Sequence, residues 1–320
     1  MRQRRGGRPS RRIASPTSAS SPSALEAVSP LRLWLMAARP RTLPAAIAPV
    51  LVGSALACSQ GTFRPLAFVA ALVGSVFIQI GTNLSNDYSD ARRGADTEDR
   101  LGPVRVTAGG LMPPKRVLVG TYVAFGVAVA AGAYLTAIAG WQLLLVGAAS
   151  ILAGVLYTGG PRPYGYEGLG EVFVFLFFGV VAVVGSYFVQ TEELSWEAFA
   201  LSVPVGLLAS AILVVNNIRD VETDRRAGKR TLAVQLGRDR ARGLFVAMIA
   251  LSFLAPVAIW LAGGLSAWVL LALLSAPLAV PLLRSVRTRT DGPALNDALA
   301  ATGRLLAVFS LLLAAGVLAS

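Results

Sequence analysis

The chain has 320 residues, of which 55% are hydrophobic and only 14% charged, with a formal net charge of +12. A soluble domain has about 25% charged residues, so this composition excludes an ordinary soluble protein and indicates an integral membrane protein. The sequence has no histidine, which excludes histidine triads and histidine metal sites, and its single cysteine, Cys58, excludes an internal disulfide. The basic residues lie in the N-terminal tail and in loops without any RNA- or DNA-binding motif, so no nucleic-acid partner is expected.

Residues 1–28 are rich in Arg, Ser, Pro and Gly, and they contain no short apolar core typical of a cleavable signal peptide. Such a segment cannot bury a hydrophobic core, so we predict a disordered basic tail followed by one membrane domain over residues 29–320. The tail either binds anionic lipid headgroups or is an incidental extension.

Residues 31–40 predict a short interfacial helix that leads into the first membrane span. Each of the apolar segments that follow is long enough to cross a hydrocarbon core of about 30 Å. They lie at 43–60, 66–84, 117–138, 141–158, 170–189, 198–217, 243–262, 266–283 and 299–319. The sequence therefore predicts an all-α, multi-pass bundle of nine transmembrane helices.

The lysines and arginines predict how the bundle is oriented. Outside the tail, nearly all of those between spans lie in the loops after the second, fourth, sixth and eighth spans, whereas the opposite loops hold only Arg64. Positively charged loops remain on the cytoplasmic side. We therefore expect a protein of the plasma membrane whose N-terminus and charged loops face the cytoplasm.

Two polar and acidic clusters end the second and sixth spans, at residues 83–90 (NLSNDYSD) and 216–224 (NNIRDVETD). On a helix, Asn83, Asp87 and Asp90 are spaced i, i+4 and i+7, and so share one face. The second cluster repeats this pattern with Asn216, Asp220 and Asp224 at i, i+4 and i+8. Carboxylates at the ends of membrane helices are costly and usually functional.

The spacing of these clusters suggests a parallel internal repeat, because four spans separate their helices and both helices cross in the same direction. A duplication of this kind brings the two clusters face to face across a central cavity. Mg²⁺ prefers oxygen ligands and commonly bridges carboxylates to a substrate phosphate, while neighbouring Arg and Lys neutralise the remaining phosphate charge. The clusters thus predict a site for Mg²⁺ and a diphosphate. The plainer alternative is that these charges cap helices and pair within loops.

The same residues carry a resemblance to the UbiA superfamily of intramembrane prenyltransferases, whose aspartate-rich motifs have the forms NDxxD and DxxxD. Asn86-Asp87-x-x-Asp90 and Asp220-x-x-x-Asp224 match these motifs. Within the superfamily the chain most resembles the branch that prenylates 1,4-dihydroxy-2-naphthoate in menaquinone synthesis. The supporting segments are 38–44 (ARPRTLP), 94–103 (GADTEDRLGP), 157–161 (YTGGP) with Tyr164-Gly165, and 216–232.

The resemblance covers about residues 30–320 and implies a nine-helix bundle around a central cavity that opens laterally to lipid. It implies that Mg²⁺ on both motifs holds a polyprenyl diphosphate, which ionises to an allylic cation. The acceptor ring attacks this cation at the carbon bearing the carboxylate, and CO₂ and diphosphate leave. The expected product is a demethylmenaquinol.

The resemblance also implies roles for individual residues. We expect the metal and diphosphate ligands, which are also the catalytic residues, to be Asp87, Asp90, Asp220 and Asp224, assisted by Asn83 and Asn216. The candidates for binding phosphate are Arg92, Arg105, Lys229 and Arg230, with Arg93 or Arg219 as replacements. Arg41 and Tyr157 are candidates for the acceptor pocket, although Tyr157 is equally well explained as an interfacial aromatic residue.

Aromatic residues of the fifth span allow two interpretations. They line the prenyl channel, or they pack against lipid, and the second interpretation is favoured for most of them. They are Phe173, Phe175, Phe177 and Phe178. One position departs from the superfamily pattern: many members have an Asp where this chain has Gly94, which leaves Asp96 as the next possible ligand of the first cluster.

Other functions remain open at the level of the sequence. The same fold prenylates other acceptors, such as 4-hydroxybenzoate, homogentisate, a porphyrin or a sugar phosphate. A secondary transporter also carries charges near helix ends, but usually near the membrane midplane. A non-catalytic scaffold leaves the paired clusters unexplained. The length of the prenyl chain, the proton acceptor and the oligomeric state do not follow from the sequence.

Overall fold

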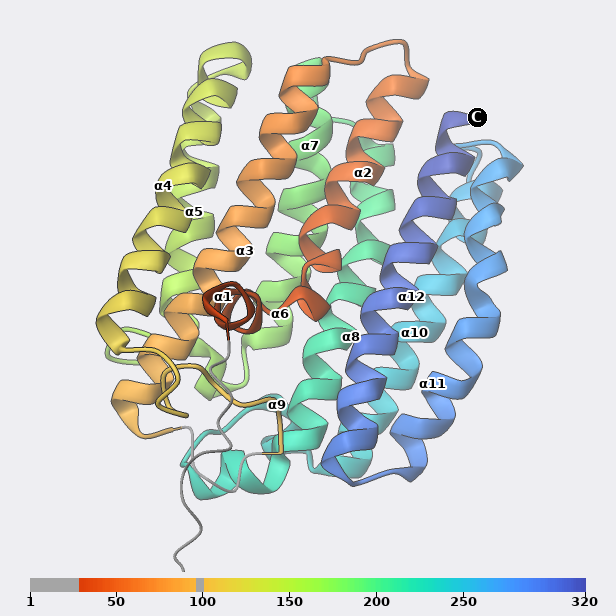
Figure 1. The fold of residues 1–320 in the computed structure, drawn as a ribbon. Coiled ribbons are helices and arrows are strands. Elements are labelled where there is room, and N and C mark those ends of the chain that lie inside the picture. Colours follow the sequence, from red (N-terminus) through yellow and green to blue (C-terminus); the bar gives the residue numbers. More distant parts are fainter. Residues whose placement is uncertain (1–28, 96–100) are drawn as a thin grey trace, which may run out of the picture.

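The computed structural model describes residues 29–95 and 101–320, and over these ranges the chain is an all-α bundle (Figure 1). The fold class expected from the sequence is confirmed. The basic tail predicted over residues 1–28 lies outside the described residues.

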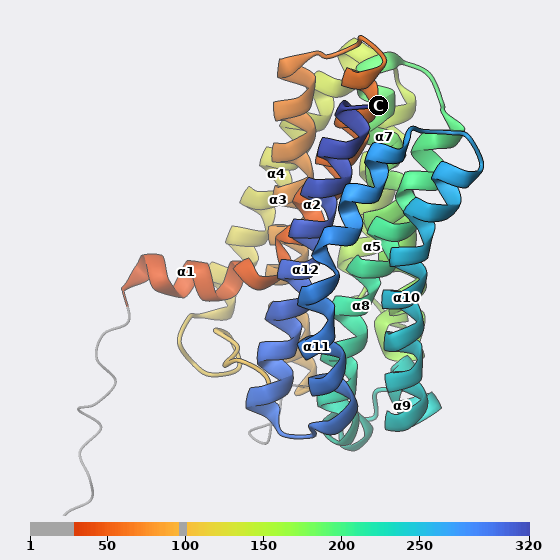
Figure 2. The same cartoon turned by 90° about the vertical axis from the view of Figure 1, so that its right-hand side faces the viewer.

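The long helices run roughly parallel or antiparallel to one another along the bundle, and short helices connect some of them (Figures 1 and 2). The first half of the chain forms α1 (Pro30–Ala38), η1 (Pro40–Thr42), α2 (Pro44–Ser59), α3 (Pro65–Arg93), α4 (Pro114–Ala139), α5 (Gln142–Leu156) and η2 (Tyr164–Glu167). The remainder forms α6 (Gly170–Val174), η3 (Phe175–Val181), α7 (Ala182–Thr191), α8 (Trp196–Arg226), α9 (Leu232–Leu236), α10 (Arg238–Leu261), η4 (Ala267–Ser275), α11 (Ala276–Thr288) and α12 (Gly292–Leu318).

Each predicted span coincides with a helix or a continuous run of helices, but the count of nine is approximate. Among the described residues, seven stretches are long and apolar enough to cross a membrane. The other two predicted spans are α2, with 16 residues, and α5, with 15. The segment containing α1 and η1 is bent by 54° relative to α2 and reaches the required length only together with it.

Proline and glycine set the helix ends that matter for the site. Pro44, Pro65 and Pro114 occupy the first turns of α2, α3 and α4, where a missing N–H costs no helical hydrogen bond. Gly94 ends α3 in the left-handed conformation, with φ of 64°. The position at which many superfamily members have a further Asp is therefore a helix-terminating glycine in this chain, and Asp96 lies outside the described residues.

The hydrophobic core lies around α8, where 72% of the 18-residue apolar stretch that could span the membrane is buried. Leu201 and Leu208 of α8 belong to a cluster of fully buried side chains that includes Phe245 of α10 and Phe309 of α12. In α3 and in α4, only 28% of the corresponding apolar stretch is buried. The stretches of α12 and α10 are 56% and 28% buried, so α8 and α12 are central helices of the bundle, whereas α3, α4 and α10 lie at its periphery.

One irregular element was not predicted from the sequence. The predicted span 170–189 contains the π-helix η3 between α6 and α7. At this point η3 approaches α8 so closely that a Cβ added to Gly179 would lie 2.7 Å from the Cα of Gly206. The short helix predicted at residues 31–40 is present as α1, which runs perpendicular to the long helices (Figure 2). Ala37 of α1 packs with Leu84 of α3 and Val117 of α4.

Candidate active site

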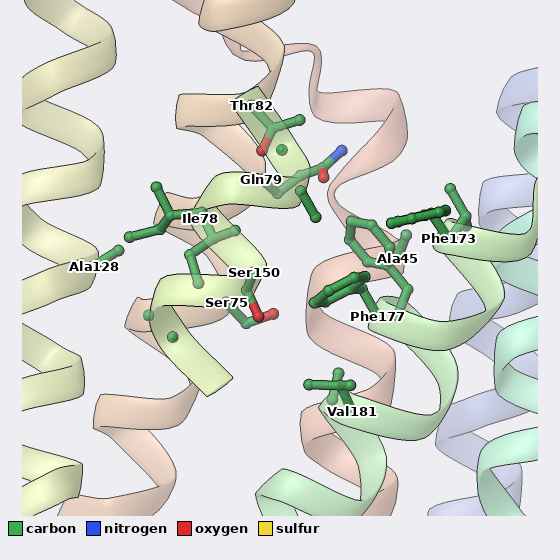
Figure 3. A pocket seen from close by; sticks show the side chains of 18 of the residues that line it. Ala45, Ser75, Ile78, Gln79, Thr82, Ala128, Ser150, Phe173, Phe177 and Val181 are labelled. Atoms are coloured by element: carbon green, nitrogen blue, oxygen red, sulfur yellow. The ribbon is translucent and has the colours of Figure 1, made fainter. Parts of the chain in front are cut away.

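A cavity of about 470 Å³ lies among α2, α3, α4, α5, α7 and α8. Its lining follows α3 from Ala71 to Asp90, which is about 28 Å of helix at 1.5 Å per residue. Polar residues that include Asn86, Asp90 and Arg105 line one end, whereas most of the remaining lining is apolar. Figure 3 shows side chains that line this cavity, including the rings of Phe173 and Phe177. The cavity therefore suits a ligand with a charged head and a long apolar tail.

Asp87 is 1% exposed and is held by the loop between α3 and α4. Its two carboxylate oxygens accept the backbone N–H groups of Val106, at 3.2 Å, and Thr107, at 3.1 Å. An ionised carboxylate has about four lone-pair sites, so two such bonds leave room for a metal ion. In this structure, Asp87 fixes the loop that carries Arg105.

Asp90 lies one helical turn further along α3, is 2% exposed, and lines the cavity. Tyr166 donates its hydroxyl to Asp90 at 2.6 Å. Two cations approach the other carboxylate oxygen, Arg105 at 3.7 Å and Lys229 at 3.9 Å. The predicted phosphate-binding residues Arg105 and Lys229 therefore lie beside the predicted metal ligand Asp90.

The asparagines of the first motif have different partners. The Nδ2 group of Asn83 donates to the carbonyl of Ala38 at 2.9 Å and to the hydroxyl of Thr42 at 3.3 Å. Asn83 thus ties the turn between α1 and α2 to α3. Asn86 accepts the hydroxyl of Thr158 at 3.0 Å and lines the cavity.

The second motif lies on α8 and is built around the buried Arg219, which is 1% exposed. Arg219 forms a bidentate pair with Asp220, with N–O distances of 2.7 and 2.5 Å. It also donates to Asn216 at 2.8 Å and to Asn296 of α12 at 2.6 Å. Asn296 in turn donates to the carbonyl of Leu101, so the second motif also reaches the loop between α3 and α4.

The two motifs meet through the loop that follows α8. Asp224 accepts a hydrogen bond from the hydroxyl of Thr231 at 3.5 Å, and its backbone carbonyl accepts the N–H of Lys229 at 2.9 Å. The side chain of Lys229 then reaches Asp90 of the first motif and lies 4.8 Å from the ring centroid of Tyr166. Asn216 and Asp90 line the same cavity. Each cluster thus contributes to the lining of one cavity, but of the four predicted metal ligands only Asp90 is among the lining residues; Asp87, Asp220 and Asp224 are not.

The structure does not bring all of the predicted basic residues to the polar end of the cavity. Arg92 and Arg230 are exposed, and Arg92 donates to the hydroxyl of Tyr88 at 3.1 Å. The replacement candidate Arg93 donates to the carbonyl of Gly160. Arg41 is exposed and is not among the residues that line the cavity, whereas its neighbour Arg39 is.

An aromatic wall extends from the polar end into the cavity, and Tyr157 is part of it. The rings of Tyr157 and Tyr164 make an edge contact at 5.5 Å, Tyr164 stacks on Phe173 at 4.0 Å, and Phe173 stacks on Phe177 at 6.2 Å. Burial raises the pKa of the Tyr164 phenol, which stays protonated and donates to the carbonyl of Ala153.

Of the four phenylalanines considered for the prenyl channel, three line the cavity: Phe173, Phe177 and Phe178. Phe175 points elsewhere and lies against Gly206 of α8.

Sequence reasoning did not identify several residues of the site. Tyr166 links the first motif to the loop that follows α8, since its hydroxyl donates to Asp90 and its carbonyl accepts the N–H of Arg230 at 2.8 Å. Glu171 is a buried carboxylate that accepts the amide of Asn217 at 2.8 Å. Neither residue belongs to a recognised motif, and their positions depend on contacts between distant segments. Asn86 could have been selected, because it is the first residue of the NDxxD motif.

The donors at this end fit a magnesium ion that arrives with a phosphate ligand. Within residues 29–95 and 101–320, no three acidic, histidine or cysteine side chains form a ready metal cage. Mg²⁺ is usually held by one or two carboxylates together with substrate phosphates, so a cage is not required. Asp90 lines the cavity, and Lys229 links it to Asp224, because the Lys229 side chain reaches Asp90 and its backbone N–H donates to the backbone carbonyl of Asp224. Together with the amide oxygens of Asn86 and Asn216, these two aspartates offer hard oxygen ligands at the polar end.

Comparison with known proteins identifies the family. Residues 46–307 match the model of the UbiA prenyltransferase family. The chain is similar to the 1,4-dihydroxy-2-naphthoate octaprenyltransferase of Mycobacterium leprae, with 40% identity over 88% of this chain and 94% of that protein. The protein of the same name from Mycobacterium tuberculosis is 41% identical over 88% of this chain and 95% of its own.

Among solved structures, the fold is similar to that of a UbiA homologue from Archaeoglobus fulgidus bound to DMAPP and Mg²⁺. The TM-score is 0.60 and the identity 14%, over 88% of this chain and 98% of that one. A likeness at this identity shows the fold.

Proposed function

This chain belongs to the UbiA prenyltransferase family, and we propose that it transfers a polyprenyl group from a polyprenyl diphosphate to 1,4-dihydroxy-2-naphthoate. The observation that carries the proposal is Asp90, flanked by Arg105 and Lys229, at the polar end of a cavity whose other lining is mostly apolar. The names of the relatives at 40% and 41% identity support the choice of acceptor.

The diphosphate binds at the polar end. Asp90 and Asp224 would hold Mg²⁺ with the diphosphate, and Asp87 and Asp220 would supply further carboxylate oxygens from the same two helices. The chemistry that Mg²⁺ would supply there is neutralisation of the charge on the diphosphate oxygens. Arg105 and Lys229 bind the departing phosphate oxygens, where negative charge develops in the transition state.

The prenyl tail occupies the apolar part of the cavity. Gly132, Gly147 and Gly185 line it, and a Cβ added to any of these would have nothing within 4 Å. A larger side chain there projects into the cavity without displacing the backbone. We expect Gly147→Leu to shorten the longest prenyl diphosphate that is turned over. Competition between C10, C20 and C40 diphosphates, measured by product mass, checks this expectation.

The aromatic wall flanks the allylic cation and excludes water from it. Ring faces carry negative charge, so Tyr157, Phe173 and Phe177 stabilise a nearby cation. The acceptor attacks the cation through the ring carbon that bears the carboxylate, and a new C–C bond forms there. The bond from this carbon to the carboxylate then breaks, its electrons restore the aromatic ring, and CO₂ leaves. The products are demethylmenaquinol, CO₂ and diphosphate, as expected for a step in menaquinone synthesis.

The test is to incubate the purified protein with geranyl diphosphate, Mg²⁺ and one acceptor at a time. We expect a prenylated, decarboxylated product with 1,4-dihydroxy-2-naphthoate, detected by mass spectrometry. If product forms with 4-hydroxybenzoate or homogentisate instead, the protein is a prenyltransferase, but the proposed acceptor is wrong. Because detergent solution has no ion gradient, turnover there also separates an enzyme from a secondary transporter.

We also propose that the protein lies in the plasma membrane with the polar end of the cavity in the cytoplasm, as the loop charges predict. The single cysteine offers a test, because Cys58 is exposed near the end of α2, close to the only arginine on the opposite side, Arg64. A membrane-impermeant maleimide should label Cys58 in intact spheroplasts. A Cys58→Ser, Gly228→Cys variant should be labelled only in inverted vesicles, and the reverse pattern would invert the topology.

A further inference from the structure

Among the described residues, two arginines line the cavity, Arg39 and Arg105. Arg105 lies beside Asp90, where the diphosphate is proposed to bind. Arg39 belongs to a different wall, at the turn between α1 and α2. The proposed reaction uses two anionic ligands, a diphosphate and an aromatic carboxylate. Arg105 lies where the diphosphate is proposed to bind, which leaves the carboxylate as the ligand for Arg39.

The backbone at Arg39 is unusual for its residue type. Arg39 ends α1 with φ of 53° and ψ of 70°, in the left-handed region where glycine is the common choice. Glu192 is the only other non-glycine residue with positive φ among the described residues. Glycine at position 39 would end the helix with less strain, which points to a role for the arginine side chain.

The turn that carries Arg39 is fastened to the cavity-facing side of α3. Asn83 donates to the carbonyl of Ala38, and both Asn83 and Gln79 donate to the hydroxyl of Thr42. The guanidinium of Arg39 donates to the carbonyl of Asn83 at 3.4 Å. Asn83, expected from the sequence to assist the metal, therefore acts here as a positioning residue for Arg39.

We propose that Arg39 binds the carboxylate of the aromatic acceptor, an inference that rests on the proposed function. A guanidinium presents two parallel N–H groups that match a carboxylate, and such a bidentate pair fixes orientation as well as affinity. In the proposed acceptor the carboxylate sits on the carbon that is prenylated. Anchoring it on the Arg39 wall directs that carbon towards the allylic cation, with the ring against the aromatic wall of Phe173 and Phe177.

The experiment uses the full-length protein in detergent and compares Arg39→Gln with two matched arginine variants. Arg32→Gln lies on the same helix, α1, at an exposed position and is the neutral control. Arg41→Gln tests the residue that the sequence suggested for the same pocket. We expect Arg39→Gln to raise KM for 1,4-dihydroxy-2-naphthoate roughly 10- to 100-fold, as for the loss of a charged hydrogen-bond partner. The KM for geranyl diphosphate should not change.

A second readout isolates the carboxylate itself. Inhibition by 1-hydroxy-2-naphthoate is compared with inhibition by 1-naphthol, which differs only in lacking that group. The wild type should prefer the carboxylated inhibitor, Arg39→Gln should lose the preference, and Arg39→Lys should keep part of it. A merely structural role would weaken both inhibitors equally. If Arg39→Gln does not fold, the ratio measured for Arg39→Lys decides the question.

The outcomes separate this inference from the proposed function. If the wild type makes no product with 1,4-dihydroxy-2-naphthoate, the proposed function fails. If the wild type is active and Arg39→Gln keeps its preference for the carboxylated inhibitor, the inference about Arg39 is overturned. It is also overturned if Arg41→Gln alone removes that preference.

Discussion

The two aspartate-rich motifs are alike in sequence but are held by different parts of the molecule. On α3, Asp87 accepts two backbone N–H groups from the loop between α3 and α4. On α8, Asp220 is paired with the buried side chain of Arg219, inside the core of the bundle. The first motif therefore holds this loop directly, whereas the second motif holds the buried Arg219 and reaches the loop only through Asn296. Similar motifs need not make similar contributions to the site.

The largest expected effect is the loss of the metal, which tests whether both motifs serve one ion-dependent site. EDTA should abolish turnover, because without Mg²⁺ the carboxylates of both motifs repel the diphosphate. Adding Mg²⁺ back should restore it, and titrating the restored rate gives the affinity for the metal. Full activity in the presence of EDTA would show that neither motif acts through a divalent ion.

The next largest effects are expected from replacing single aspartates of the two motifs, and turnover is compared among the variants. Asp90→Asn removes charge beside Arg105 and Lys229, and kcat with geranyl diphosphate should fall by roughly 10²–10³-fold, as when one stabilising group for transition-state charge is removed. Asp87→Asn and Asp220→Asn should also lose turnover while remaining folded and inserted. Substantial residual activity in any of the three would contradict its assigned role.

Hydrogen exchange distinguishes Asp87 from Asp220. Asp87→Asn weakens the acceptor of the Val106 and Thr107 amides, so these amides should exchange faster, as measured by mass spectrometry. Asp220→Asn leaves that contact in place and should change their exchange less. Equal changes in both variants would remove the distinction between a loop-fixing and a cation-fixing motif.

A smaller effect is expected at Tyr166, which links the first motif to the loop after α8. Tyr166→Phe removes the hydroxyl that donates to Asp90 but keeps the ring beside Lys229. The loss of one hydrogen bond to a charged group should lower kcat/KM for geranyl diphosphate roughly 10-fold. Tyr122→Phe, at an exposed position on α4, is the matched control. A Tyr166→Phe enzyme with wild-type kinetics would show that the bridge has no catalytic consequence.

The smallest effect is expected at Asn296, which connects Arg219 to the carbonyl of Leu101. Asn296→Asp keeps an acceptor for Arg219 and removes the donor to Leu101, at a cost of about 1 kcal/mol in stability. Thermal unfolding in detergent measures this cost, and Asp297→Asn, an exposed neighbour, is the control. A stability equal to that of the control would show that the second motif does not hold the loop.

The sequence predicts the fold well because hydropathy reports the length of each apolar span directly. It also identifies Asp90, Arg105 and Lys229, which the structure places together. It does not identify Tyr166, because a tyrosine in a short connection carries no periodic signal. The π-helix η3 is likewise set by packing between distant helices rather than by local composition, whereas the sequence predicts the short helix α1 but not its contacts with α3 and α4.

The sequence also does not identify which arginine lines the proposed acceptor pocket. Residues 38–44 suggested Arg41, but the structure places Arg39 on the cavity and leaves Arg41 exposed. The two positions differ by a turn whose direction depends on the left-handed conformation of Arg39 and on hydrogen bonds from Asn83. The segment 94–103, which pointed to the acceptor, includes residues 96–100 outside the described residues.

The transverse helix α1 indicates where the site lies relative to the membrane surface. Leu31 and Leu35 of α1 are exposed, which favours a position where acyl chains give way to headgroups. Ala37 of α1 packs at the level of Leu84, and Asp90 lies about 9 Å further along α3 at 1.5 Å per residue. The carboxylates therefore lie near the depth of the lipid headgroups, which is also where the ionic end of an isoprenoid diphosphate lies while its chain remains in the leaflet.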